Sequence, residues 1–177
     1  MGLDFVVVSS DVDESPYPNE APEPYVIRLA EQKARAGWSD PALSLGADTI
    51  VAIDGNLLGK PENQFHARTM LEQLSGRVHE VLTGVAVFDG VSCRSLCVIS
   101  KVHFRAISND EINAYWDSGE PLGKAGGYAI QGLGGIFVQR IEGSYSAIVG
   151  LPIAQTEALL VGSGLDTWGG RACLKNS

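Results

Sequence analysis

Two short turns constrain the fold of this chain more than any other feature of its sequence. Asp54-Gly55 follows an apolar run at residues 45–53, and Asp89-Gly90-Val91 separates the runs at 79–89 and 92–105. Such turns between β-branched runs are typical of hairpins, in which neighbouring strands are antiparallel. Helical patterns lie between these hairpins. This excludes a doubly wound parallel sheet, and we predict an α/β or α+β domain with a central mixed β-sheet.

The remaining elements are predicted from the spacing of apolar residues and from capping residues. Dense prolines exclude a regular element over residues 11–24, and Ser108 with Glu111 forms a capping-box pattern. We expect one domain over residues 1–164 and a tail at 165–177. The predicted strands are 5–10, 45–53, 56–58, 79–89, 92–105 and 136–141, the predicted helices are 25–37, 63–74 (with Phe65 inward), 109–116 and 152–161, and 143–150 is a loop or short strand.

Charge and composition exclude several classes of protein. The sequence has 13 Lys and Arg against 21 Asp and Glu, a net charge of −8, whereas nucleic-acid-binding domains are usually basic. No apolar run reaches the roughly 18 residues of a membrane span, and the first residues lack a signal-peptide pattern. Cys93, Cys97 and Cys173 do not have the spacing of metal ligands, and three scattered cysteines are typical of a protein in a reducing compartment. We expect a cytoplasmic protein that binds neither nucleic acid nor membrane, and a homodimer stays open.

A single carboxylate interrupts the apolar strand predicted at residues 45–53. Asp48 stands in Leu-Gly-Ala-Asp-Thr-Ile-Val, and a buried carboxylate must be paired, hydrogen-bonded or bound to a metal ion because burial without a partner is costly. The alternative is an aspartate that caps a turn at a strand end. Lys60 follows in Gly-Lys-Pro, where glycine and proline direct the ammonium group, although a surface lysine in a turn has the same pattern.

Two further charged residues precede this strand. Lys33 falls on the apolar side of the helix predicted at residues 25–37, where a lysine usually extends its ammonium group to solvent. Glu14 lies in an acidic loop after the first predicted strand. Most such loops are solvated, but carboxylates at a strand end also hold Mg²⁺, so both alternatives stay open.

A glycine-rich segment at residues 124–132 contains one lysine, one tyrosine and one glutamine. The amide of Gln131 can donate and accept, which suits the edge of a nucleobase, and the glycine backbone offers N–H groups to phosphate. A tight turn has the same composition and is the alternative. His66, His79 and His103 lack ligand spacing, so we expect no metal site built from histidine.

Five motifs follow one another along the chain, at residues 47–51, 59–61, 74–84, 124–132 and 143–152. Their order and spacing resemble the Maf (septum-formation) family of nucleotide pyrophosphatases from Gly2 to about Gly164. The forms Ala-Asp-Thr, Tyr-x-Ile-Gln-Gly and Gly-Ser-Tyr-Ser are similar to the dTTP/UTP pyrophosphatase branch rather than the 7-methyl-GTP branch. Family members carry a strand and a Ser-Pro-Arg-Arg segment before the position of Phe5, which the printed sequence lacks, so we expect a form extended by that segment to be more stable and more active.

The resemblance implies a fold, a reaction and a set of site residues. The family's fold is an elongated α/β structure with a mixed sheet and a substrate cleft, related to inosine-triphosphate pyrophosphatases. Its reaction is hydrolysis of a nucleoside triphosphate, here dTTP or UTP, to the monophosphate and pyrophosphate with Mg²⁺ or Mn²⁺. Matched by motif, the site residues are Asp48 as proton acceptor, Lys33 and Lys60 at the phosphates, Glu14 and Asp48 at the metal, and Thr49 and Gln131 at the specificity positions.

Three functions compete at this point. The first is an enzyme that removes noncanonical or excess pyrimidine nucleotides, with a role in the arrest of cell division. The second is a nucleotide-binding regulator with weak catalysis, and the third is a truncated, inactive remnant. Pyrophosphate release from dTTP or UTP distinguishes the first from the others.

Overall fold

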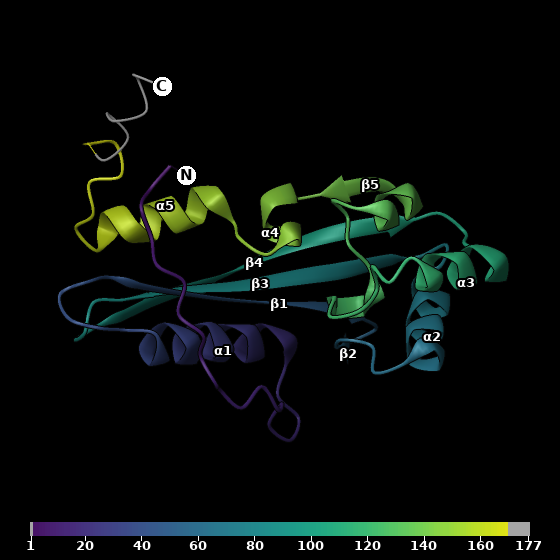
Figure 1. Cartoon of the computed structure of the whole chain (residues 1–177), viewed down its shortest axis with the longest axis horizontal. Coiled ribbons are helices and arrows are strands. Elements are labelled where there is room, and N and C mark those ends of the chain that lie inside the picture. Colours follow the sequence, from purple (N-terminus) through teal and green to yellow (C-terminus); the bar gives the residue numbers. More distant parts are fainter. Residues whose placement is uncertain (1, 170–177) are drawn as a thin grey trace.

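The structure, a computed structural model, describes residues 2–169. These residues form an elongated body in which one long β-sheet lies between helices (Figure 1). The strands are β1 (Ser44–Ile53), β2 (Asn56–Leu58), β3 (Val78–Phe88), β4 (Cys93–Phe104) and β5 (Val138–Glu142). The α-helices are α1 (Pro22–Ala36), α2 (Gln64–Leu74), α3 (Asn109–Asp117), α4 (Tyr145–Val149) and α5 (Ile153–Gly162), and short 3₁₀ helices occupy Ala125–Gly127 and Leu133–Phe137.

The five strands form one sheet in the order β2-β1-β3-β4-β5, and every pair among them is antiparallel. The predicted α/β domain with a central sheet is confirmed, but within residues 2–169 this sheet is antiparallel rather than mixed. The reason is that β1–β2 and β3–β4 are hairpins, and the segment with α2 returns the chain so that β3 runs opposite to β1. The long strands β3 and β4, of 11 and 12 residues, follow the long axis of the molecule.

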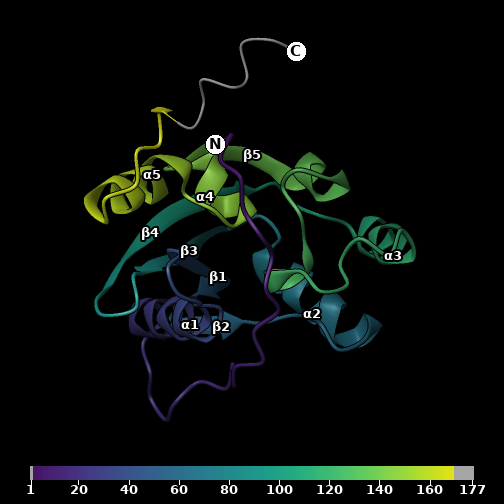
Figure 2. The same ribbon diagram turned by 60° about the vertical axis from the view of Figure 1, so that its left-hand side comes forward.

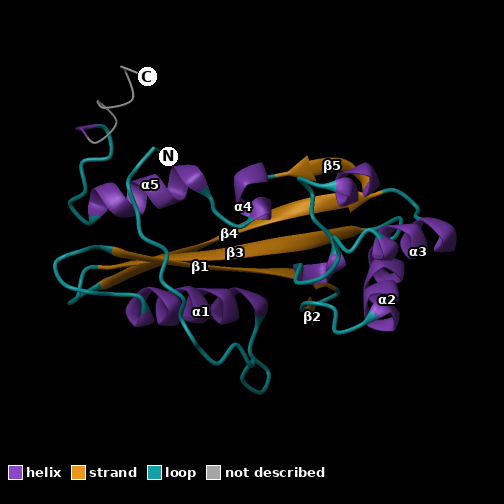
Figure 3. Cartoon of the chain, in the orientation of Figure 1, coloured by secondary structure: helices purple, strands orange, loops and turns teal. Residues whose placement is uncertain are grey.

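Helices cover both faces of this sheet. Helix α1 lies along one face, and α4 and α5 lie along the other (Figure 3). Helix α1 approaches the backbone of β1 and β3 closely, because a Cβ atom at Gly46 would clash with the Ala30 carbonyl and one at Gly84 with the Val26 carbonyl. This close packing places Lys33, in the last turns of α1, directly beside β1.

A second group of helices, α2 and α3, lies near one end of the sheet, away from α5 (Figure 2). Aromatic rings join this region to the sheet: Phe104 packs edge-on against Tyr128 with ring centroids 4.7 Å apart, and Tyr115 packs against Phe137 at 5.1 Å. Such edge-to-face pairs add to the stabilisation that burial gives. They anchor the glycine-rich segment after α3 close to β1.

Two local predictions are confirmed with small shifts in their bounds. The capping box of α3 is formed: the Ser108 hydroxyl accepts from the N–H of Glu111, and the Glu111 carboxylate accepts from the N–H of Ser108 at 2.8 Å. Helix α1 begins at Pro22, three residues before the predicted start, so the expectation that prolines exclude a regular element up to residue 24 is wrong for residues 22–24. Prolines fit there because the first turn of a helix leaves its N–H groups unpaired.

Three local predictions are wrong. Residues 5–10 form no strand: no described strand pairs with them, and Val6 and Val7 are 87% and 82% exposed, because β-branched composition alone does not hold a strand without packing. Phe65 is 78% exposed, since α2 packs through its Ala67, Met70 and Leu71 face. Residues 145–149 form helix α4 instead of a loop or short strand.

The first residues of the predicted tail are packed against α5. Thr167 is buried and donates to the Glu157 carboxylate at 2.9 Å. The rest of the predicted tail, with Cys173, lies outside the described residues. None of the described helices combines the length and apolar composition that crossing a bilayer requires.

Candidate active site

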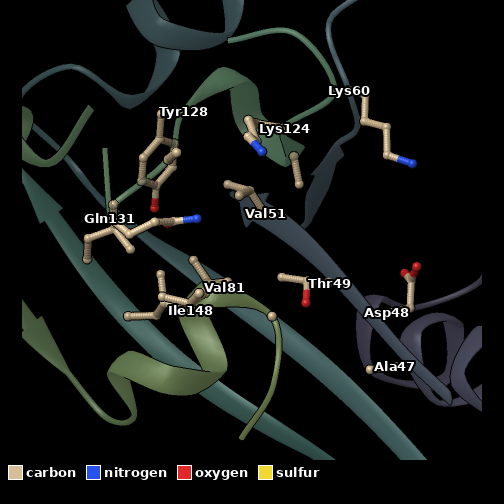
Figure 4. Close-up of a pocket in the computed structure, with 16 residues that line it drawn as sticks. Ala47, Asp48, Thr49, Val51, Lys60, Val81, Lys124, Tyr128, Gln131 and Ile148 are labelled. Atoms are coloured by element: carbon tan, nitrogen blue, oxygen red, sulfur yellow. The ribbon is translucent and has the colours of Figure 1, made fainter. Parts of the chain in front are cut away.

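A cleft opens beside β1 where this strand lacks a neighbour. Strand β2 pairs only with residues 51–53, so within the described chain no strand covers the outer edge of β1 at residues 44–50. The cleft there has a volume of about 280 Å³, and its walls come from β1, the glycine-rich segment and residues 148–150 (Figure 4). Successive strand residues point to opposite faces of a sheet. Asp48 therefore lies on the face that α1 covers, and Thr49 lies on the face that α4 covers.

Asp48 is paired, and its partner is the lysine of α1. The ammonium group of Lys33 donates to Asp48 Oδ1 at 2.6 Å and lies 2.6 Å from Glu14 Oε1. The ammonium group of Lys60 reaches Glu14 Oε2 at 3.3 Å. The structure thus brings the four charged residues into one group of ion pairs, of which Asp48 and Lys60 line the cleft, although Glu14 and Lys60 are 46 positions apart.

Two carboxylates share the one ammonium group of Lys33. Burial raises the pKa of Asp48 above its usual value, against the opposing effect of Lys33, whereas the hydrogen bond from Lys33 lowers the pKa of the more exposed Glu14. Burial opposes the charge of Lys33, but the hydrogen bonds to Asp48 and Glu14 outweigh it and raise the pKa of Lys33. Asp48 is therefore the carboxylate of this group that takes up a proton most readily, which suits a general base.

The other end of the cleft is less charged. Figure 4 shows the Gln131 amide at this end near Tyr128, and the Thr49 side chain nearer Asp48, with the apolar side chains of Val81 and Ile148 between Gln131 and Thr49. Lys124 also lines the cleft. Within residues 2–169 the Gln131 amide forms no hydrogen bond. Apolar walls with an uncommitted amide suit a flat heterocycle that carries both donors and acceptors.

Sequence reasoning missed the contacts of two buried polar residues behind the cleft, His79 and Thr83. The Tyr128 hydroxyl, in the cleft wall, lies 2.8 Å from Nε2 of buried His79, and burial with a smaller effect of His103 lowers the pKa of His79 to about 4. Thr83, fully buried in β3, lies opposite Thr49 of β1. The available signal was a polar residue inside each apolar run, but only the strand register shows what these residues contact.

The motif Gly-Ser-Tyr-Ser contributes through backbone geometry. The Ser144 hydroxyl accepts from the N–H of Ala147 at 3.2 Å, and the Ser146 hydroxyl accepts from the N–H of Ile153 at 3.2 Å. These two bonds cap α4 and fix the turn toward α5. The residues that follow α4, including Gly150, consequently line the cleft.

A carboxylate pair is the available donor set for a metal ion. Across the described residues, no group of three or more His, Cys, Asp or Glu is placed to hold a metal. Glu14 and Asp48 nevertheless converge on one point, since each lies 2.6 Å from Lys33 Nζ. Mg²⁺ is commonly held by one or two carboxylates while substrate phosphates and water complete its shell, so this pair fits a metal that binds together with a nucleotide.

Comparison with known proteins identifies the family of this chain. The family described as "Maf-like protein" matches residues 1–162. The dTTP/UTP pyrophosphatase of Pseudoalteromonas atlantica is 50% identical over 166 residues, 90% of this chain and 86% of that protein. The dTTP/UTP pyrophosphatases of Hahella chejuensis and Vibrio vulnificus (strain YJ016) are 49% and 47% identical, over 95% and 90% of this chain and 86% and 88% of those proteins. The chain therefore belongs to the Maf family.

Proposed function

We propose that this chain hydrolyses dTTP and UTP between the α- and β-phosphates, giving the nucleoside monophosphate and pyrophosphate. The observation that carries the proposal is one cleft with a charged group, Asp48, Lys33, Glu14 and Lys60, at one end and the uncommitted amide of Gln131 at the other. The names of the relatives, which are about 50% identical, support the same substrates.

Asp48 acts as the proton acceptor in this proposal. A water molecule attacks the α-phosphorus and gives its proton to the Asp48 carboxylate, while the bond from the α-phosphorus to the bridging oxygen breaks and pyrophosphate leaves. The raised pKa of Asp48 supports this role, since a general base works best when its pKa approaches the working pH. Lys33 and Lys60 donate to phosphate oxygens as negative charge develops there.

Glu14 and Asp48 would hold Mg²⁺ or Mn²⁺ against the phosphates. The metal would neutralise part of the phosphate charge and polarise the α-phosphate. In the structure both carboxylates contact Lys33. A metal held by them would take the place of the Lys33 ammonium group, which would then be available to the phosphates.

Gln131 supports the choice of base. Thymine and uracil share an edge with the O4 acceptor beside the N3–H donor, and a side-chain amide can pair with this edge together with a neighbouring polar group of the cleft. A polar site of this kind rejects a base that leaves its groups unpaired. Thr49 lines the same cleft and belongs to the same specificity region.

Pyrophosphate release in the presence of Mg²⁺ or Mn²⁺ tests the proposal with a panel of dTTP, UTP, CTP, ATP, GTP, ITP and 7-methyl-GTP at equal concentrations. We expect dTTP and UTP to have the highest kcat/KM. Tight binding of dTTP without turnover would favour the nucleotide-binding regulator instead. Preference for 7-methyl-GTP or ITP would place the chain in another branch of the family.

We further propose that residues 1–164 carry this activity and that it serves the cytoplasmic nucleotide pool by removing noncanonical or excess pyrimidine nucleotides, with arrest of cell division as a downstream role. The net charge of −8 supports a small-molecule substrate rather than a nucleic acid. The homodimer stays a prediction, and light scattering after size-exclusion chromatography tests it.

A further inference from the structure

Two threonine hydroxyls meet beside the cleft, between Asp48 and Gln131. Thr49 on β1 and Thr83 on β3 are register partners, and their hydroxyl oxygens lie 2.9 Å apart. The Thr83 hydroxyl also lies 2.7 Å from the carbonyl oxygen of Ala147 in α4. Thr83 is fully buried, whereas Thr49 lines the cleft.

The direction of these two hydrogen bonds follows from counting hydrogens. A carbonyl oxygen only accepts, so the Thr83 hydroxyl must give its single hydrogen to Ala147. With that hydrogen committed, Thr83 can only accept from Thr49. The Thr49 hydroxyl therefore directs its own hydrogen away to Thr83, and it can offer a ligand only its remaining lone pair.

The acceptor that determines this direction is held firmly. Ala147 belongs to α4, which Ser144 caps, and its carbonyl also accepts from the N–H of Gly150 at 2.8 Å. Gly150 borders the Thr49 hydroxyl, because a Cβ atom at Gly150 would lie 3.7 Å from Thr49 Oγ1. The motif at residues 143–152 thereby sets the polarity of a group in the cleft.

Gln131 alone cannot distinguish uracil from cytosine. Its amide has no partner within the described residues that would fix its orientation, so it can turn over and present donor and acceptor in either order. One order complements the O4 and N3–H of uracil, and the other complements the N4 amino group and N3 lone pair of cytosine. A second group of fixed polarity is needed to reject cytosine.

We propose that Thr83 is this positioning residue: it fixes the Thr49 hydroxyl as an acceptor for the N3–H of thymine or uracil, which leaves the Gln131 amide to donate to O4. Cytosine, with a lone pair at N3, would face the lone pair of Thr49 and be rejected. The inference rests on the proposed function, since it assigns the basis of pyrimidine choice at the same site.

The decisive experiment compares kcat/KM for UTP and CTP in the wild type, Thr83→Val and Thr83→Ser. Valine has nearly the same shape but frees the Thr49 hydrogen, so that the hydroxyl can donate to the N3 of cytosine. We expect the UTP/CTP ratio to fall by about tenfold or more in Thr83→Val, and to stay within about twofold of wild type in Thr83→Ser, which keeps the hydroxyl.

If Thr83 had only a structural role, Thr83→Val would lower kcat/KM for UTP and CTP in parallel. The UTP/CTP ratio would then stay unchanged, and this result would overturn the proposal. If Thr83→Val does not fold, Thr83→Ala serves instead, because it also removes the hydroxyl that accepts from Thr49 and must reduce the UTP/CTP ratio in the same direction.

Calorimetric binding of α,β-imido-UTP and α,β-imido-CTP with Mg²⁺ separates this inference from the proposed function. If wild-type protein shows no turnover but binds the UTP analogue in preference, and Thr83→Val loses that preference, then the hydrolase function fails and the role of Thr83 stands. Active protein whose UTP/CTP ratios in binding and turnover do not change in Thr83→Val refutes the role of Thr83 and leaves the hydrolase function in place.

Discussion

Replacement of Asp48 by asparagine tests the role of this carboxylate as proton acceptor while the fold of the cleft is retained. The amide has the size of the carboxylate and keeps an oxygen to accept from Lys33, but it can take no proton from water. Lys33 also keeps its contact with Glu14 at 2.6 Å. We therefore expect Asp48→Asn to fold and bind nucleotide but to lose most of its turnover.

The magnitudes of the two effects differ widely. A positioned general base contributes about 10²- to 10⁴-fold to a rate, so kcat on dTTP should fall by at least about a hundredfold. The structural cost is that of converting one charge-assisted hydrogen bond into an ordinary one, on the order of 1 kcal/mol. For a domain of this size that lowers Tm by about 2–4 °C.

The pH profile gives an independent readout. Because burial raises the pKa of Asp48, and because the base must be ionised, kcat/KM should be full above this pKa and fall as the pH drops through it. The acid limb should lie at higher pH than an ordinary aspartate would produce. Asp48→Asn should lack that limb, since its residual activity does not depend on this proton.

A matched control is Asp54→Asn. Asp54 forms an ion pair with Arg77 at 2.7 Å, is largely exposed and lies outside the cleft, so its replacement should leave kcat unchanged. Both variants and the wild type would be assayed for pyrophosphate release and thermal melting. Near-wild-type turnover of Asp48→Asn, or an acid limb that persists in this variant, would remove Asp48 from its role as base.

Three further outcomes follow from the packing, the caps and the buried histidine. Gly84→Ala should destabilise the fold by about 3 kcal/mol or more in urea unfolding, because the new Cβ atom meets the backbone of α1, whereas Gly162→Ala, with ordinary space around it, should change stability little. Ser108→Ala should remove the capping box of α3 and lower Tm by about 2–4 °C, as expected for a loss of about 1 kcal/mol. The pKa of His79 is lowered to about 4, so its contribution to stability should be full above pH ~6.5 and be lost as the pH falls toward ~4. The free energy of unfolding should decrease by about 3 kcal/mol over this range. Urea unfolding should show this decrease in the wild type and not in His79→Gln.

Much of the fold was readable from local sequence patterns. The turn Asp54-Gly55 defined the β1–β2 hairpin, and β2 was predicted at its observed bounds. Ser108 and Glu111, which are three residues apart, defined the start of α3. These predictions succeeded because a tight turn or a helix cap is determined by residues within one or two turns of chain.

The site was readable only as separate residues. A carboxylate inside an apolar strand marked Asp48 as needing a partner, and the motifs of the family named the others. Which group satisfies Asp48 was open, because Lys33 lies 15 positions away on a helix and its ammonium group could as well have extended into solvent. The packing of α1 onto the glycines of β1 and β3 decided that question.

Local patterns in the sequence were thus enough to predict the hairpins, the caps, the exclusion of a doubly wound parallel sheet and the residue types of the cleft. Long-range packing was needed to show that residues 5–10 pair with no described strand, that residues 145–149 form a helix, and that Thr83 lies opposite Thr49 on the neighbouring strand. These three cases share one cause. A propensity is a property of neighbouring residues, whereas a strand partner, a shared proton or the direction of a hydroxyl depends on segments that meet only when the whole chain has packed.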